Sequence, residues 1–491
     1  MAAPLHTLKI LEQSQVSPPP GSVPTTSLPL TFFDLLWYFC CPMQRLYFYQ
    51  SPHPTQFIYQ TLLPNLKNSL SLTLKHFFPY AGNLICSPSP ARPHILYTEG
   101  DSVPFTIAES DAEFDRLIAD YPRDVQEHHP FVTNLPPTRT EGDARVVPLM
   151  ALQVTVFPNS GISIGVTFCH MVADGRAFHH FMKSWGSVCK SNGDLRFIEK
   201  SMPFHGRVSI KIPCGVEGDV LKSFWDWASV EKEDLGPMNL KKLAGKVRAT
   251  FNLGQAQIER LQHWVKNQFT EEELDTLHIS TFVVTCALLW VCLIKSSQSM
   301  ELTKFSKEDE PYFFAFVGDC RNRLESPIPY TYFGNCLAFC FLSVNRNELL
   351  GEKGIVAAAK GIGKRVKQLE CNGALEGAEN WMQEWKEIVD KYKFFTVAGS
   401  PKLGIYDTDF GLGRPKKTEL LHTDVSGAIS LSDSRENEFG VEVSLAISKA
   451  QMDCFSSIME DNLQLENIYS GVRILGSLGL CIEEERIRWT T

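Results

Sequence analysis

One stretch in the middle of the chain decides the fold: Ala151-Leu-Gln-Val-Thr-Val-Phe157, Pro158-Asn-Ser-Gly161, Ile162-Ser-Ile-Gly-Val-Thr-Phe168, then Cys169-His170-Met-Val-Ala-Asp174-Gly175. The two β-rich runs predict strands over residues 151–157 and 162–168, because a turn-forming cluster separates them. A helix is expected directly afterwards, since apolar residues recur at helical spacing at Phe178, Phe181, Met182 and Trp185. A strand pair that passes straight into a helix indicates an α/β architecture.

The second half of the chain repeats this alternation of strand and helix. We expect helices over residues 258–265 and 282–294, strands over 312–317 and 337–342, a half-exposed strand over 441–445, and a helix after the capping box at 448–451. The predicted fold class is therefore α/β, with two similar-sized mixed-sheet lobes. Residues 1–200 would form the first lobe, the proline-containing stretch 201–247 a crossover linker, and 248–491 the second lobe.

Composition excludes several classes of protein. A chain of 491 residues is too long for one ordinary core, and its net charge of -9 argues against a nucleic-acid binder. None of the 14 cysteines forms a C-x-x-C pair or a zinc-ligand spacing, so we expect reduced thiols, a cytoplasmic protein and no metal site. The longest apolar run, 282–294, is shorter than the ~20 residues that a membrane-spanning helix needs. It predicts a buried core helix that begins at Ser280 or Thr281, and we expect a monomer without a membrane span.

His170 is the leading candidate for chemistry. It continues the parity of Ile162, Ile164, Val166 and Phe168, so its imidazole would point to the apolar side of the strand. A lone histidine in such a place is more often structural than catalytic. An imidazole with a pKa near ~6.5 can nevertheless take a proton from a hydroxyl nucleophile at neutral pH, which is the work of a general base.

A second signature, Asp409-Phe-Gly-Leu-Gly-Arg-Pro415, lies toward the end of the chain. This pair of signatures resembles the plant BAHD acyltransferases, which move an acyl group from coenzyme A onto a hydroxyl or an amine. Four further segments fall in the family's order: Thr31-Phe-Phe-Asp34, Phe78-Pro-Tyr-Ala-Gly82, Asp319-Cys-Arg321 and Tyr332-Phe-Gly-Asn-Cys336. The resemblance implies two similar lobes with a solvent channel between them.

The resemblance also implies roles within the first signature. His170 would be the general base, without a covalent acyl-enzyme. Asp174 and Gly175 would be structural, with Asp174 turned away from the channel and paired with an arginine, which we assign to Arg321. The alternative for Asp174 is a simple helix N-cap, which is compatible with that role. Cys169 departs from the polar residue that many relatives have, and we expect no loss of catalysis from it.

The second signature would hold the architecture needed for the donor, through Asp409, Phe410, Gly411 and Gly413, with Leu412 in place of the family's tryptophan. Coenzyme A would be a co-substrate and no cofactor would be bound permanently. Its phosphates require Lys or Arg, and the candidates are Arg414, Lys416, Lys417, Lys360, Lys364 and Arg365, although a solvated charge run is an equal alternative. Thr396 or Ser400 is a candidate hydrogen-bond donor to the oxyanion, although a turn before a strand is an equal interpretation.

The Tyr332–Cys336 stretch and the pattern Ser430-Leu-Ser-Asp-Ser-Arg435 resemble the branch that acts on anthocyanin, flavonoid and phenolic glucosides. We expect a sugar hydroxyl as acceptor and malonyl-CoA as donor, with a coumaroyl or caffeoyl donor close behind. Arg176 could meet a malonyl carboxylate if it faces the channel, although a place at a surface helix start is the main alternative. Competing functions are a hydroxycinnamoyl transfer to shikimate, quinate or an amine, the reaction of a condensation domain, and non-catalytic binding of a phenolic compound or CoA.

Overall fold

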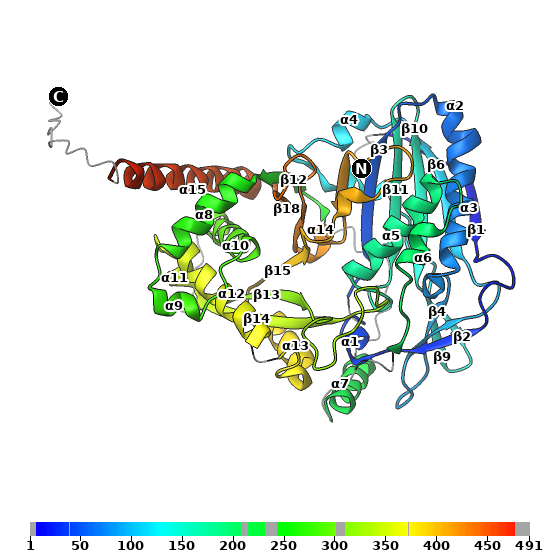
Figure 1. Cartoon of the computed structure of the whole chain (residues 1–491), viewed down its shortest axis with the longest axis horizontal. Coiled ribbons are helices and arrows are strands. Elements are labelled where there is room, and N and C mark those ends of the chain that lie inside the picture. Colours follow the sequence, from blue (N-terminus) through cyan, green and yellow to red (C-terminus); the bar gives the residue numbers. More distant parts are fainter. Residues whose placement is uncertain are drawn as a thin grey trace.

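The protein has two α/β lobes that lie side by side along its longest axis (Figure 1). They are seen in a computed structural model that describes residues 6–38, 40–207, 210, 215–230, 243–300, 310–371 and 373–476. Both lobes contain a mixed sheet with parallel and antiparallel neighbours. The predicted fold class is therefore confirmed.

The first lobe is built on a six-stranded sheet in the order β1-β6-β10-β11-β3-β16. Its strands are β1 (Leu8–Val16), β6 (Val103–Ser110), β10 (Met150–Phe157), β11 (Gly161–Phe168), β3 (Met43–Gln50) and β16 (Lys417–Leu420). The predicted strand pair is β10 and β11, which are antiparallel and buried along their whole length. Helices α3 (Leu63–Leu74) and α5 (Gly175–Lys190) pack together beside this sheet, where the Trp185 Nε1–H donates to the Leu66 carbonyl at 3.1 Å.

The second lobe is built on a seven-stranded sheet in the order β14-β13-β15-β17-β18-β12-β7. Its strands are β14 (Leu337–Asn345), β13 (Pro311–Asp319), β15 (Phe394–Gly399), β17 (Ile429–Asp433), β18 (Val441–Ser448), β12 (Lys246–Leu253) and β7 (Arg123–Asp124). Its main helices are α8 (Gln255–Lys266), α10 (Thr281–Met300), α12 (Gly354–Cys371), α13 (Trp381–Lys391) and α15 (Lys449–Gly476). The helix α15 extends away from the body of the lobe (Figure 1).

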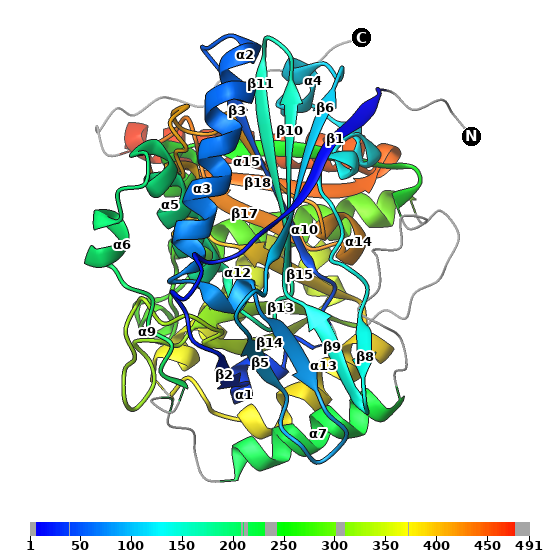
Figure 2. The ribbon, with the colours of Figure 1, turned by 90° about the vertical axis from the view of Figure 1, so that its right-hand side faces the viewer.

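A third, five-stranded sheet lies at one end of the first lobe, in the order β2-β5-β4-β9-β8 (Figure 2). Its strands are β2 (Thr26–Pro29), β5 (His94–Tyr97), β4 (Asn83–Cys86), β9 (Ala144–Pro148) and β8 (Arg139–Glu141). The shorter helices of the two lobes are α1 (Phe32–Leu35), α2 (Thr55–Phe57), α4 (Phe114–Leu117), α6 (Arg196–Lys200), α9 (Glu271–Asp275), α11 (Arg346–Leu350) and α14 (Thr423–Ser426).

The sheet of each lobe contains one strand from the part of the chain that forms the other lobe. The strand β16 comes late in the chain and pairs with β3, whereas β7 comes early and pairs with β12. A single cut in the chain therefore does not separate the two sheets. The predicted linker contains the helix α7 (Val216–Val230), and its residues 208–209, 211–214 and 231–242 lie outside the described residues.

The helix α10 is the predicted core helix and begins at Thr281. It is longer than the apolar run that predicted it, and by length and composition alone it could cross a membrane. However, 72% of its apolar window is buried inside the protein, which is the environment of a core helix.

The prediction of a half-exposed strand over 441–445 is wrong. Every residue from Val441 to Ala446 on β18 is buried, including Glu442 and Ser444. These polar side chains are inside because Lys417 and Glu419 of β16, which pairs with the sheet of the first lobe, contact them there.

Candidate active site

His170 lies two residues beyond β11, in the loop that leads into α5, at the junction of the two lobes. Its side chain is buried, and only 7% of the residue is exposed. The ring stacks on Trp37 with 3.7 Å between centroids and 5° between planes. The Nδ1 atom is 3.2 Å from Oδ1 of Asn335, which belongs to the second lobe. Both lobes therefore hold the same imidazole.

Burial lowers the pKa of His170 to about 4, because the imidazolium ion loses its hydration in this apolar setting. Nearby groups, including Asp174 and Asn335, offset only part of this effect. The ring is therefore neutral at pH 7 and has a lone pair for a proton, as a general base requires.

Asp174 is turned away from this imidazole and pairs with Arg321, the arginine that the sequence indicated. Its Oδ2 is 2.8 Å from Nη1 of Arg321 and its Oδ1 is 3.1 Å from Nη2, with both side chains buried. The same carboxylate accepts the backbone N–H of Ala177 at 3.0 Å, which makes it the N-cap of α5, and that of Cys336 at 3.1 Å. Asp174 thus joins the His170 loop to the second lobe.

The two residues after Asp174, Gly175 and Arg176, also contact the second lobe. Gly175 opens α5, and a Cβ there would approach the Leu403 side chain to 3.3 Å. The Arg176 Nε–H donates to Asp319 at 2.7 Å, and its guanidinium lies 4.7 Å from the centre of the Tyr330 ring. The charge of Arg176 is therefore already balanced by a carboxylate of the protein.

The second signature packs against α5 near its far end. The Asp409 carboxylate accepts the backbone N–H groups of Gly411 at 2.8 Å and Gly413 at 2.9 Å, and it pairs with Lys190 at 2.8 Å. Both glycines have positive φ, 96° and 84°, which an L side chain would strain. Phe410 is buried and makes an edge-to-face contact with Trp185, with 4.8 Å between the ring centroids. Leu412 is partly buried and packs against the same core. These contacts give the loop a structural role.

The basic candidates for coenzyme A separate into two groups. Lys417 is buried and pairs with Asp120 at 2.6 Å, so the interpretation of Lys417 as a phosphate ligand is wrong. Arg414 donates to the Tyr406 carbonyl and lies 3.6 Å from Asp407, and Lys360 pairs with Glu273 at 2.7 Å, although both remain partly exposed. Lys364 is exposed, and Lys416 and Arg365 are intermediate. Contact of these residues with phosphate stays a prediction.

Thr396 and Ser400 lie on and just after β15 rather than in a turn before a strand. Thr396 is opposite Ala315 in the parallel pairing with β13, and Ser400 Oγ accepts the backbone N–H of Lys402 at 3.2 Å. An oxyanion role for either residue stays a prediction.

Two residues of the site, Trp37 and Asn335, were not identified as site residues from the sequence. Both lie in or beside segments that carried the family resemblance, residues 31–34 and 332–336. Only the folded chain shows that these segments meet at His170. Among the described residues, no group of three or more His, Cys, Asp or Glu side chains could hold a metal ion.

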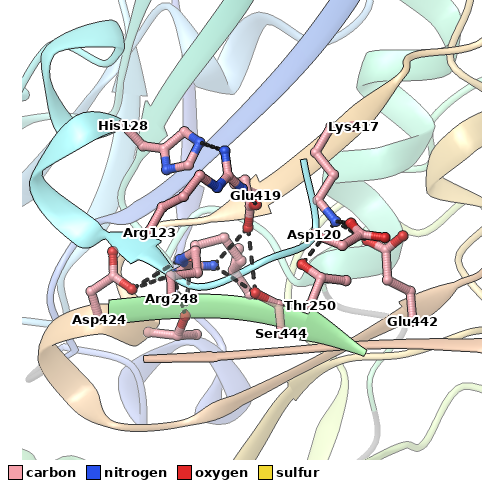
Figure 3. Close-up of polar contacts among 12 residues, drawn as sticks. Asp120, Arg123, His128, Arg248, Thr250, Lys417, Glu419, Asp424, Glu442 and Ser444 are labelled. Carbon is pink, nitrogen blue, oxygen red and sulfur yellow. Dashed lines mark hydrogen bonds and ion pairs between the residues drawn. The ribbon is translucent and has the colours of Figure 1, made fainter. Parts of the chain in front are cut away.

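A buried cluster of charges joins the lobes away from His170, and Figure 3 shows its members. Arg248 on β12 is at its centre, with Nη1 2.8 Å from Glu419 of β16 and further contacts to Asp424 and Ser444. Lys417 of β16 lies 3.6 Å from Glu442 of β18. Burial raises the pKa of Glu442 to about 7, although Lys417 opposes the shift. The exchanged strand β16 is thus held by charges as well as by its ladder.

A buried neutral imidazole lies between two α/β lobes, and an Asp–Arg pair fixes its loop, which is an arrangement that a histidine general base requires. The model of the Transferase family matches residues 8–462. The chain belongs to this family, the BAHD acyl-CoA-dependent acyltransferases, as the motifs predicted, and it is an acyltransferase that uses acyl-CoA as co-substrate.

Curated relatives resemble the chain along nearly its whole length. It is 42% identical to coumaroyl-CoA:anthocyanidin 3-O-glucoside-6''-O-coumaroyltransferase 1 of Arabidopsis thaliana, over 94% of this chain and 99% of that protein. It is 38% identical to malonyl-coenzyme A:anthocyanin 3-O-glucoside-6''-O-malonyltransferase of Dahlia pinnata, over 94% and 98%. The crystal structure of vinorine synthase has the same fold, with a TM-score of 0.63, 18% identity and coverage of 91% of this chain and 96% of that one.

Proposed function

We propose that this enzyme transfers an acyl group from acyl-CoA to a sugar hydroxyl of an anthocyanin or other phenolic glucoside. The observation that carries the chemistry is the buried, neutral His170 held by both lobes. The relatives named above, which act on anthocyanin glucosides according to their names, support the acceptor.

The reaction needs one base and no covalent enzyme intermediate. The imidazole of His170 removes the proton of the sugar hydroxyl while its oxygen attacks the thioester carbonyl. The C–S bond of the tetrahedral intermediate then breaks, the electron pair leaves with sulfur, and the imidazolium returns the proton to the CoA thiolate. Because burial lowers the pKa of His170, its imidazolium is a stronger acid than an ordinary imidazolium and gives up this proton readily.

For the donor we propose an aromatic hydroxycinnamoyl-CoA of the coumaroyl type. Trp37 stacks on His170 and lies 5.2 Å from the Phe339 ring, which in turn lies 6.0 Å from Trp381. This row of rings ends beside a pocket with a mixed lining of aromatic, polar and charged residues: Phe341, Arg365, Gln368, Glu376, Gly377, Trp381 and Glu384. The rings between His170 and this pocket support a flat aromatic acyl group, which can stack on them.

Malonyl-CoA, the donor that the sequence favoured, is the second candidate. The relative from Dahlia pinnata supports it, and Arg176 lies in the first turn of α5, close to His170 in the chain. However, a malonyl carboxylate would have to compete with Asp319 for this guanidinium. The ion pair with Asp319 therefore supports our choice of the aromatic donor over malonyl-CoA.

A matrix assay tests the proposal directly. Coumaroyl-, caffeoyl-, malonyl- and acetyl-CoA are each combined with anthocyanins, flavonoid glucosides, simple phenolic glucosides, shikimate and an amine, and products are identified by mass. We expect coumaroylation of a glucosyl group, loss of nearly all turnover in His170→Ala, and unchanged turnover in a matched surface variant, His263→Ala. Transfer to an aglycone hydroxyl, an amine or shikimate, with sugars untouched, would overturn the acceptor.

The same assay separates an enzyme from a binding protein. Saturable CoA binding with no product in any combination would contradict catalysis and support non-catalytic binding as the function. A folded and fully active His170→Ala variant would contradict the mechanism while leaving the acceptor untouched.

We also propose that the enzyme works as a cytosolic monomer. Cysteines in both lobes, among them the buried Cys86, Cys169 and Cys286, are free thiols, which supports a reducing compartment. Light scattering after gel filtration should give a mass near the 55.3 kDa of one chain, and a mass of two chains would contradict the monomer. A fluorescent fusion should fill the cytosol.

A further inference from the structure

The hydrogen bonds of Asn335 determine which nitrogen of the neutral His170 ring carries the hydrogen. The Asn335 side-chain Nδ2 donates to Oδ1 of Asp34 at 2.9 Å and to the backbone carbonyl of His170 at 2.9 Å. The Asn335 backbone N–H donates to the same Asp34 oxygen at 3.0 Å. Asp34 and Asn335 are both fully buried, so water does not take the place of these partners.

These contacts allow only one orientation of the amide. If the amide were turned over, its oxygen would face a carboxylate and a carbonyl, which have no hydrogen to give. The NH₂ group must therefore face Asp34, and Oδ1 must face Nδ1 of His170 at 3.2 Å. Because an amide oxygen only accepts hydrogen bonds, Nδ1 carries the hydrogen of the neutral ring. The lone pair of the imidazole is then on Nε2.

The other carboxylate oxygen of Asp34 is also fixed by close contacts. Its Oδ2 accepts the Thr31 backbone N–H at 2.8 Å and the Thr31 hydroxyl at 2.7 Å, and it pairs closely with Arg207. Arg207 is itself buried, and its guanidinium lies 5.7 Å from the centre of the Tyr332 ring. Arg207 comes from the segment between the lobes, far in sequence from its partner Asp34.

We propose that Arg207 and Asp34 are positioning residues that act through Asn335 and set His170 as the Nδ1–H tautomer, with Nε2 as the base. The relay Arg207–Asp34–Asn335–His170 links the inter-lobe segment, the first lobe and the second lobe to one nitrogen atom. It rests on the proposed function only where turnover is concerned, since the tautomer is a property of the free protein.

The direct test is nitrogen NMR of the full-length protein labelled with ¹⁵N-histidine, with the His170 signals assigned by their loss in His170→Ala. We expect the neutral ring to be protonated at Nδ1 at pH 7. In Asn335→Leu, which removes the acceptor, we expect a mixture of the two tautomers. A wild-type ring protonated at Nε2 would overturn the proposal, whether or not the variants fold.

Steady-state kinetics test the role of the distant pair. Asn335→Leu and Arg207→Leu should each lower kcat about tenfold, equal to about 1.4 kcal/mol of barrier, with both KM values within about twofold. Arg207→Lys keeps the charge beside Asp34 and should recover most of the loss. The matched control is Arg92→Leu, which removes the partly exposed ion pair with Glu217 and should change nothing.

Wild-type kcat in both folded leucine variants, or an equal loss in Arg92→Leu, would overturn the positioning role. A wild-type protein that transfers no acyl group would contradict the proposed function alone, because the NMR experiment still reads the tautomer.

Discussion

Replacement of Arg248 by methionine should strongly destabilise the contact between the lobes. Arg248 is fully buried, and its Nη1 lies 2.8 Å from Glu419 while its Nη2 pairs closely with Asp424. It also donates to Ser444 at 3.1 Å (Figure 3). Further hydrogen bonds go to Thr423 Oγ1 at 3.1 Å and to the Leu420 carbonyl at 2.9 Å. A methionine fills part of the space but supplies no charge and no donor.

The magnitude follows from what would remain. Glu419 would still have Arg123 at 3.5 Å, and Asp424 would still have His129 at 3.0 Å. Each of these two buried carboxylates would therefore lose its strongest partner and retain a weaker one. Removal of one member of a buried ion pair costs about 3–5 kcal/mol. Folded proteins are stable by about 5–15 kcal/mol, so the loss would be a large share of the total.

Urea unfolding followed by tryptophan fluorescence measures this loss. With an m value of about 3 kcal/mol/M, the midpoint should fall by about 1 M or more. The matched control is Arg139→Met, which breaks an exposed pair with Glu141 and should cost about 0–1 kcal/mol. If the free energy of unfolding of Arg248→Met is within about 1 kcal/mol of the wild-type value, with the same m value, the cluster does not hold the lobes together.

Three further predictions concern stability and pH. Asp174→Ala should cost about 3–5 kcal/mol, because it leaves the buried Arg321 with only Asp319, at 3.3 Å, as a counter-ion and uncaps α5; a melting temperature equal to that of the wild type would contradict this. The folded pKa of Glu442, about 7, is above its ordinary value of 4.5, so its stabilising effect is complete below pH 4.5 and is lost as the pH rises through 7. Glu442→Gln should therefore be more stable than the wild type at pH 8, by up to about 3 kcal/mol, with the difference vanishing near pH 4.5; equal denaturation midpoints at pH 8 would refute this. In the pH profile of kcat/KM, the midpoint of the acid limb should lie nearer pH 4 than pH 6.5, because burial lowers the pKa of His170. A midpoint at pH 6.5 would mean that the imidazole is hydrated and would contradict this.

Local patterns in the chain predicted most of the fold. The strands β10 and β11, the apolar stripe of α5 and the core helix α10 follow from short-range periodicity, because side chains that alternate or recur every turn must share a face. The predicted capping box at Ser448 is likewise local, and its N-cap half is present, because the Gln451 backbone N–H donates to Ser448 Oγ at 3.3 Å, while the Gln451 side chain donates to Ser297 at 2.7 Å. Which lobe holds a given strand was not predictable, because β7 and β16 pair with strands more than one hundred residues away.

Errors arose where polar residues meet partners that are distant in the chain. The alternation of Glu442 and Ser444 with valines indicated an exposed face, but these side chains face a charge cluster that includes residues of β16. Lys417 belongs to a basic run with Arg414 and Lys416. Nothing in that run shows that Lys417, unlike its two neighbours, forms an ion pair with Asp120. A sequence gives the charge of a residue but not its counter-ion.

The sequence by itself determined the class of this protein, and it selected His170 as the candidate base and Asp174 as the residue that holds the loop, because these depend on residue type and spacing. The tertiary structure decided the environment of that imidazole. Burial beneath Trp37 lowers its pKa, and Asn335, itself directed by Asp34, selects the nitrogen that carries its hydrogen. The physical reason is that desolvation and hydrogen-bond direction depend on atoms a few ångströms away, and folding brings those atoms from positions about 130 to 165 residues away along the chain.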